Sequence, residues 1–201
     1  ASASVLSLLS STANIQKNSL AVNIKGGSFG YFNPSVLIKS GTGEKFRHAF
    51  SAEYQRADGA YPYKNYVAGN ADSKRLNSDI RSYRTEYDAA YFVNDSNKIK
   101  LKLYYYNARR GLPGAVILYN NFSRERFNTE TFFTQMTWQK NMSLRSRILL
   151  SGKYSKDYKY YSDPAYPNSA GKLENKIHQQ EFYVSGAYSY KCSYFTAAFS
   201  S

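Results

Sequence analysis

Hydrophobic and polar residues alternate along most of this chain, and the alternation predicts its elements. In the run KIKLKL at 98–103, lysine occupies the even positions and isoleucine or leucine the odd ones. Successive side chains of a strand point to opposite faces, so this period predicts a strand with one apolar and one polar face. About nine such strands are expected, in or near the segments 19–25, 34–40, 46–55, 83–93, 98–105, 132–138, 145–154, 179–188 and 194–199.

Connections of two lengths separate these segments. Four short polar turns are expected at GTGE (41–44), NDSN (94–97), KNMS (140–143) and YKCS (190–193). Long connections rich in Tyr, Asn, Asp, Gly and Pro are expected at 57–79, 107–128 and 156–176. Short turns at one end and long loops at the other predict an antiparallel, up-and-down sheet.

The strand length favours a membrane protein. Several segments have roughly 9–12 residues, the length that a tilted strand needs to cross a bilayer, whereas strands of soluble sandwiches average about 5–6. No apolar run approaches the roughly 20 residues of a membrane-spanning helix. The pattern therefore predicts an all-β, antiparallel, up-and-down transmembrane β-barrel. The alternative is a soluble antiparallel sheet with a solvated lysine face.

Charge adds a second function class to be weighed. The net charge is +13, with 21 Tyr and 12 Phe, a combination also found in nucleic-acid-binding proteins. The lysines at 98–102 share one parity, as do Arg145 and Arg147, and we expect the opposing parity to be almost free of charge. Because the aromatics are not interleaved with the lysines on one face, we expect no nucleic-acid partner and place the charges inside the barrel.

Tyrosine clusters at 104–106 and 158–161 fall where strands are expected to pass into long loops. Aromatic girdles of membrane proteins occupy that level. Catalysis finds no support, because Cys192 is the only cysteine and His48 and His178 stand far apart in the sequence. We predict a protein that is not an enzyme and has no cofactor and no metal site.

Five segments in order carry a family resemblance: GSFGYFNPSV, DGAYPYKNYVAGN, ARRGLPGAVILYN, GKYSKDYKYYSDPAYPN and HQQEFYVSGAYSY. Together they resemble the first part of the barrel of TonB-dependent outer-membrane receptors, in the form common in Bacteroidetes. Their order is similar to that in the cobalamin receptors of this family. The resemblance covers roughly residues 19–190.

The resemblance implies a 22-stranded barrel filled by an N-terminal plug and energised through the TonB complex. Residues 1–18 would then be the end of the plug or a linker, and residues 19–201 the N-terminal strands of the barrel. The expected location is the outer membrane of a Gram-negative bacterium. The expected partners are outer-membrane lipid, the TonB complex, a surface lipoprotein and a nutrient, with cobalamin ahead of siderophores, haem and oligosaccharides. Carboxylates of the plug or of the other strands would neutralise the basic inward parity.

Substrate capture in this family falls to the extracellular loops, which the resemblance places at 58–79, 110–121 and 157–175. The candidate substrate-binding residues are Tyr61, Tyr63, Asn65, Tyr66, Asn70 and Arg110. The alternative is that they are girdle and turn residues. Some cobalamin receptors bind calcium through loop aspartates; the first loop has Asp58, Asp72 and Asp79, but 107–128 has none, which argues against a calcium site.

Two other function classes remain open from the sequence. One is a small structural or adhesive outer-membrane barrel, and the other is a soluble, secreted β-sheet binding module. The start ASASVLSLLSSTA has no initiator Met and no basic n-region, so we interpret it as the middle of a longer chain rather than as a signal peptide.

Overall fold

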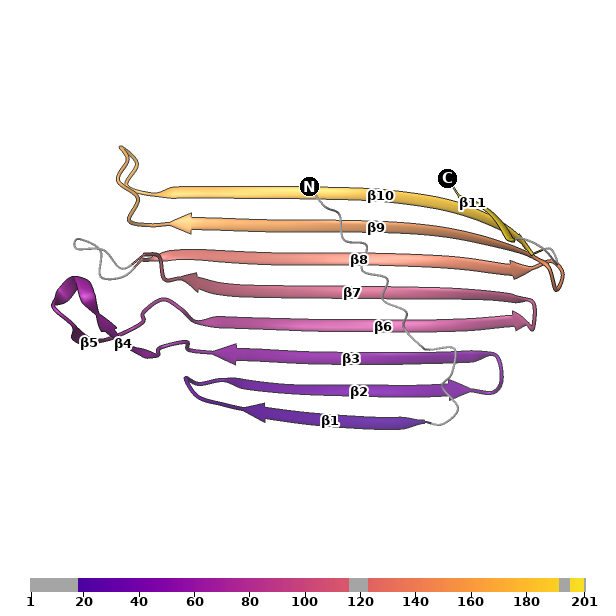
Figure 1. The fold of residues 1–201 in the computed structure, drawn as a ribbon, viewed down its shortest axis with the longest axis horizontal. Helices are drawn as coiled ribbons and strands as arrows, with labels where there is room; N and C mark the ends of the chain where they lie inside the picture. Colours follow the sequence, from indigo (N-terminus) through magenta and orange to yellow (C-terminus); the bar gives the residue numbers. More distant parts are fainter. Residues whose placement is uncertain (1–17, 116–122, 192–195, 201) are drawn as a thin grey trace.

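The protein forms one antiparallel sheet with a small hairpin at one end (Figure 1). The computed structural model describes residues 18–115, 123–191 and 196–200. In spatial order the strands of the sheet are β1 (Ser19–Gly26), β2 (Phe32–Thr42), β3 (Phe46–Ala57), β6 (Ile80–Asn94), β7 (Asn97–Leu112), β8 (Glu125–Asn141), β9 (Ser146–Asp163), β10 (Leu173–Lys191) and β11 (Thr196–Ser200).

Strands that follow one another in the chain lie side by side in the sheet, with one insertion. Between β3 and β6 the chain forms β4 (Pro62–Asn65), the short 3-10 helix η2 (Tyr66–Ala68) and β5 (Ala71–Lys74). β4 and β5 pair only with each other. The nine-stranded, up-and-down order confirms the predicted fold class, and all the longer connections lie at the left end of Figure 1. Among the described residues, no helix is long and apolar enough to cross a membrane.

The strand register gives the sheet two chemically different faces. Residues paired across antiparallel strands share a face. Ile99 of β7 pairs with Trp138 of β8, which pairs with Leu150 of β9. We call this side the apolar face. One position along, Lys100 pairs with Thr137, and this side is the polar face. The parity predicted from the lysine run is confirmed.

The sheet has almost no buried core in the described part of the chain. The buried apolar residues there are Ala89, Ala90 and Ala108, and no large side chain is fully buried. Large apolar side chains are instead exposed on the apolar face, with Phe182 at 78% and Val184 at 81%. A soluble sheet needs a second layer to cover such a face, whereas a membrane strand places it against lipid.

The exposed apolar side chains form a band that shifts along the strands. On β3 the band ends at Tyr54, and its partner Tyr83 ends it on β6. The position of β9 in register with Tyr54 is Tyr158. On β9, however, the band ends at Tyr154, four residues closer to the short turns. Beyond the band this face becomes polar again, at Arg56 on β3, for example.

Several strands are longer than the sequence pattern predicted. The connections expected at 107–128 and 156–176 shorten to the segments between Leu112 and Glu125 and between Asp163 and Leu173. The tyrosines at 158–161 therefore lie inside β9 rather than at its end. The expected turn KNMS is also displaced, because β8 continues to Asn141 and β9 begins at Ser146. The YKCS turn falls partly at residues 192–195, outside the described residues.

These strand extensions correct the expectation for charge on the opposing parity. They carry polar residues on both faces, so the period of two that marks a strand in the sequence is lost there. The apolar face consequently bears charged residues beyond the band, including Arg56, Arg81, Arg109, Lys156 and Lys176. Within the band the expectation holds.

Ion pairs neutralise part of the charge on the polar face. Lys102 lies 3.2 Å from Glu86 and 3.6 Å from Asp88, and Arg84 lies 2.7 Å from Glu53. Lys98 and Lys100 share the same face but form no ion pair with any described residue. Basic residues therefore remain in excess on the polar face.

The two-faced sheet predicts an asymmetric response to an added charge. Leu101→Arg, in the middle of the apolar band, should lower the free energy of unfolding of the intact, membrane-inserted protein by about 2–4 kcal/mol. Ser185→Arg is the matched control, because Ser185 lies one register position away on the polar face. Urea unfolding in lipid vesicles measures both. Equal losses for the two variants would contradict the assignment of the faces.

Candidate functional site

Five of the six candidate binding residues lie in or beside the β4–β5 hairpin. Asn65 ends β4 and is only 7% exposed, and its Oδ1 accepts hydrogen bonds from the amides of Val67 at 3.1 Å and Ala68 at 3.2 Å. It caps the 3-10 helix, as Asn does before helical turns. Asn70 follows that helix in the left-handed region at φ 65°, and its amide donates to the Asn65 carbonyl at 2.9 Å.

The tyrosines of the hairpin present aromatic surface. Tyr61 is 44% exposed and Tyr66 is 82% exposed. The ring of Tyr61 lies edge-on to Tyr63, with centroids 6.4 Å apart, and to Phe29 of the β1–β2 connection at 6.2 Å. This small aromatic group joins two connections at the same end of the sheet, while Tyr66 stands apart and open to a ligand.

Arg110 lies away from the hairpin. It belongs to β7, pairs with Ile80 of β6 and is exposed on the polar face. Its guanidinium lies 5.0 Å from the centre of the Phe127 ring, a cation–π contact. The structure thus brings the hairpin residues together and places Arg110 on a strand two elements further along the chain.

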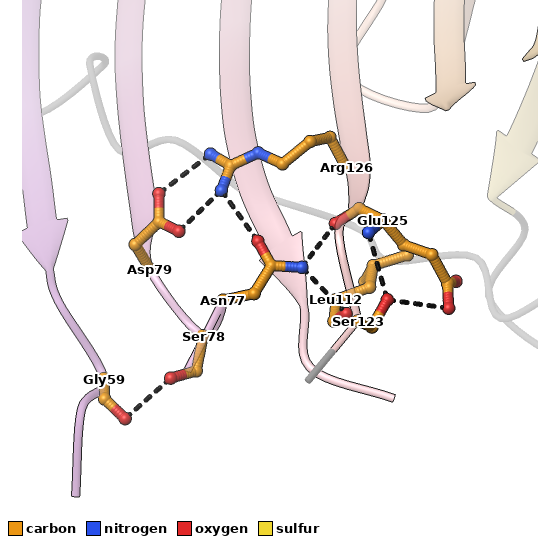
Figure 2. Close-up of polar contacts among 8 residues, drawn as sticks. All are labelled: Gly59, Asn77, Ser78, Asp79, Leu112, Ser123, Glu125 and Arg126. Carbon is orange, nitrogen blue, oxygen red and sulfur yellow. Dashed lines mark hydrogen bonds and ion pairs between the residues drawn. The ribbon is translucent and has the colours of Figure 1, made fainter. Parts of the chain in front are cut away.

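Sequence reasoning missed a polar cluster at the base of these loops, formed by Asn77, Asp79 and Arg126 (Figure 2). Arg126 Nη1 and Nη2 donate to the two carboxylate oxygens of Asp79 at 2.6 and 2.8 Å, and Nη1 also donates to Asn77 Oδ1 at 3.0 Å. This two-pronged geometry is the strong form of an arginine–carboxylate pair.

Asn77 extends the polar cluster to two further strand ends. Its Nδ2 donates to the carbonyls of Leu112 at 3.0 Å and Glu125 at 2.8 Å. Leu112 ends β7 and Glu125 begins β8, so one side chain ties the base of the first long loop to both strands that flank the second. Asn77 adopts φ 54°, a left-handed backbone that asparagine tolerates better than most residues.

Gly111 makes room for this arrangement. It lies between Asp79 and Arg126: its amide donates to the Asp79 carbonyl at 2.9 Å, and it pairs in register with Arg126 on the next strand. A Cβ at Gly111 would lie 2.3 Å from the Asn77 carbonyl oxygen. The ion pair between Asp79 and Arg126 therefore passes over β7 at Gly111, which has no side chain to obstruct it.

Two further contacts stabilise the loop bases. Tyr161 donates to Glu125 Oε2 at 2.8 Å, and Ser123 donates to Glu125 Oε1 at 2.8 Å. Burial and the hydrogen bond to Glu125 raise the pKa of Tyr161 to about 12, so its hydroxyl remains a donor at neutral pH. Arg75 donates to the Gly114 carbonyl and so links the first long loop to the second.

The aspartates considered for calcium are each engaged by a basic residue. Asp58 lies 3.5 Å from Arg56, Asp72 lies 2.7 Å from Lys64, and Asp79 belongs to the polar cluster. Within the described ranges, no three His, Cys, Asp or Glu residues gather as metal ligands would. The chemistry that this end of the sheet offers is aromatic contact, hydrogen bonding and positive charge.

Comparison with solved structures gives the fold. The chain is similar to the siderophore receptor PiuA from Acinetobacter baumannii, with a TM-score of 0.68 and 11% identity over 92% of this chain and 30% of that chain. It is also similar to the ferric-catecholate import receptor Fiu from E. coli K12 in its open form, with a TM-score of 0.62 and 10% identity over 87% of this chain and 31% of that chain.

The chain thus spans about a third of the length of these receptors. No protein-family model matches it, and no curated protein matches it in sequence. At such low identity the likeness establishes the fold alone. The sheet has the architecture of a section of an antiparallel transmembrane β-barrel.

A substitution at Gly111 tests the geometry of the polar cluster. Gly111→Ala should destabilise the loop bases by about 1–3 kcal/mol, because the added methyl group displaces the Asn77 backbone. Faster tryptic cleavage of the intact protein at Lys64 and Arg75 would report the loosened first loop. Gly152→Ala is the control, since a Cβ there meets nothing within 4 Å. Unchanged cleavage in Gly111→Ala would show that this close contact does not hold the loop.

The ion pair also predicts a pH dependence. Its hydrogen bonds with Arg126 hold the pKa of Asp79 below its usual value of 3.8. Because the folded pKa lies below the unfolded one, the pair stabilises the loop fully above pH 4 and is lost as the pH falls through the folded value. The two side chains are 40% and 36% exposed, which limits the effect to about 1 kcal/mol.

Hydrogen exchange of residues 75–79 in the intact protein measures this effect. After correction for intrinsic rates, protection should fall between pH 5 and pH 3 in the natural sequence, by about fivefold or less. Asp79→Asn should be less protected at pH 5 and should change little between the two conditions. The same pH response in both proteins would mean that another group titrates.

Proposed function

We propose that this chain forms barrel strands of a TonB-dependent outer-membrane receptor that imports a scarce small-molecule nutrient. The observation that carries the proposal is the uncovered apolar band on one face of a long-stranded, up-and-down sheet, with all the longer connections at one end. Two receptors with this fold are described as a siderophore receptor and a ferric-catecholate import receptor, which supports a transport function and not an enzyme.

The family resemblance supports proposals for the plug, the remaining barrel strands and the partner proteins. Residues 1–18 would end the plug or link it to the barrel, and residues 19–201 would begin a barrel of 22 strands. The plug would contact the TonB complex, and carboxylates of the plug or of other strands would neutralise the lysines of the polar face. A surface lipoprotein would assist capture at the loops. The proposal also includes that the receptor is of the form common in Bacteroidetes, because the five sequence motifs resemble that form.

Capture would take place at the loop end of the sheet. Tyr61, Tyr63 and Tyr66 offer aromatic surface, and Asn70 and Arg110 offer polar contacts. Asn65 would act indirectly, because its side-chain oxygen already caps the 3-10 helix that carries Tyr66. The polar cluster would hold the bases of these loops in place, so that the exposed groups keep a fixed spacing.

Two ligands are proposed, each on its own observation. Cobalamin is favoured by the order of the sequence motifs, and its large planar ring system suits the exposed tyrosines. A ferric siderophore is favoured by the two receptors of similar fold. A ferric tris-catecholate is anionic, so it suits the basic residues of the hairpin such as Lys74 and of β7 such as Arg110.

Binding to cells tests the function and the ligand together. Cells that express the intact protein should accumulate labelled cobalamin or a labelled ferric catecholate, and accumulation should stop when the proton-motive force is collapsed. Tyr66→Ala should weaken binding about tenfold, since exposed aromatic anchors carry much of the affinity in such contacts. Tyr190→Ala is the control, because Tyr190 is also exposed, at 41%, but lies at the short-turn end.

The rivals give different results in this experiment. A small structural or adhesive barrel would reach the outer membrane but accumulate neither compound. A soluble, secreted binding module would be recovered outside the membrane and would not show heat-modifiable migration. Either result would overturn the import proposal, and the fraction that contains the protein tells which rival is correct.

A further inference from the structure

Three arginines stand side by side on the apolar face, just beyond the apolar band. Arg56 of β3 pairs in register with Arg81 of β6, and Arg81 pairs with Arg109 of β7. All three are exposed. Neighbouring strands lie about 4.8 Å apart, so the row brings three positive charges together on adjacent strands. We call these residues the arginine row.

The rest of the chain neutralises this charge only in part. Arg56 reaches Asp58 at 3.5 Å, but both side chains are about half exposed, which makes the pair weak. Arg81 and Arg109 form no ion pair within the described ranges, and the nearby Asp79 is engaged by Arg126. Like charges directly opposite one another destabilise a sheet. An anion bound across the row would remove that repulsion.

The surroundings of the arginine row identify the kind of anion. Next to it on the same face lie Tyr54 and Tyr83, whose rings are 5.0 Å apart. Beyond these tyrosines lies a hollow of about 330 Å³ over the small side chain of Ala52. The hollow is lined by Val22, Pro34, Ser35, Val36, Ala52, Glu53, Tyr54, Tyr83 and Thr85.

The three features follow one another along the strands in a fixed order. Positions two apart on a strand are separated by about 7 Å, so Ala52, Tyr54 and Arg56 place the hollow, the aromatic pair and the arginine row within about 14 Å. This sequence of apolar, aromatic and cationic surface matches the acyl chain, interface and headgroup levels of a bilayer. A free anion would use only the arginine row, and the hollow would then have no occupant.

We propose that this surface binds one membrane lipid with a phosphorylated headgroup, in the leaflet on the loop side. Arginine binds phosphate through two parallel N–H···O hydrogen bonds, and the arginine row offers three such groups in line. One acyl chain lies in the hollow over Ala52. The inference rests on the membrane location given under the proposed function, but it does not depend on nutrient import.

The test measures how much lipid the purified, delipidated intact protein retains in non-ionic detergent. The probes are a bisphosphorylated hexa-acyl lipid A, the same lipid without phosphates, and inorganic phosphate. We expect tight binding of the phosphorylated lipid only. The triple substitution Arg56→Gln, Arg81→Gln and Arg109→Gln should weaken it about a hundredfold, given the known contribution of each basic residue near anionic lipid.

A control variant separates this site from general charge effects. Lys25→Gln, Lys39→Gln and Lys100→Gln remove the same charge from the polar face and should leave lipid retention unchanged. Ala52→Leu fills the hollow and should weaken binding of the phosphorylated lipid without creating any affinity for inorganic phosphate. Heat-modifiable migration shows that each variant is folded, so loss of binding is not read as loss of structure.

Each remaining outcome counts against the lipid. Equal retention of the dephosphorylated lipid would show that the arginine row plays no part. Binding of inorganic phosphate with the same affinity, or an unaltered Ala52→Leu, would reduce the site to a simple anion site. If these results occur in a protein that is still recovered in outer membranes and still accumulates its nutrient, only this inference fails, and the proposed function stands.

Discussion

The lack of a protein core is the constraint on which the rest of this structure depends. Apart from the β4–β5 hairpin, the described chain forms one sheet, and its large apolar side chains are exposed. The backbone hydrogen bonds between strands satisfy the peptide groups, but nothing within the sheet covers its apolar face. Lipid can cover that face without a second protein layer, because hydrocarbon requires only that every backbone polar group be paired. Strand length and the alternation of apolar and polar residues both follow from this one requirement.

The loop end solves a different problem, because the sheet holds its strands but not the long connections beyond them. There the polar cluster takes over from the backbone hydrogen bonds between strands. Asn77, Asp79 and Arg126 tie three strand ends together through side chains. Gly111 is the enabling residue, since the ion pair crosses its strand. The exposed tyrosines of the hairpin are thus carried by a rigid base, which is the usual arrangement for binding loops on a scaffold.

The sequence predicted what depends on local period and failed where contacts are long-range. The two faces were readable from runs such as 98–104, because alternation is a property of neighbouring residues. The strand ends were not, because beyond the band polar residues occupy both parities, as Asn128 and Thr129 do on β8. The pairing of Asp79 with Arg126 joins residues 47 apart and leaves no local signal. The same holds for the arginine row, whose members come from three strands.

The positions of the candidate binding residues were predicted in part for the same reason. The first long connection was singled out by its composition, and the structure places Tyr66 there with its side chain largely exposed. Asn65 was selected as a hydrogen-bonding group, and it is one, but toward its own backbone. A residue of that type before a short helical turn is a local signal that composition alone overlooks.

The shift of the apolar band along the strands fixes the orientation of the sheet in the bilayer. From β3 to β10, five strands away, its loop-side edge moves by four residues, or about 13 Å along the strands, while the sheet advances about 24 Å across them. A band that is level with the membrane therefore requires strands inclined by about 30° to the membrane normal, near the tilt of closed barrels. At that inclination the nine residues from Phe46 to Tyr54 span about 24 Å of hydrocarbon. The positions of a few tyrosines and arginines thus encode the shear with which a barrel containing this sheet would close.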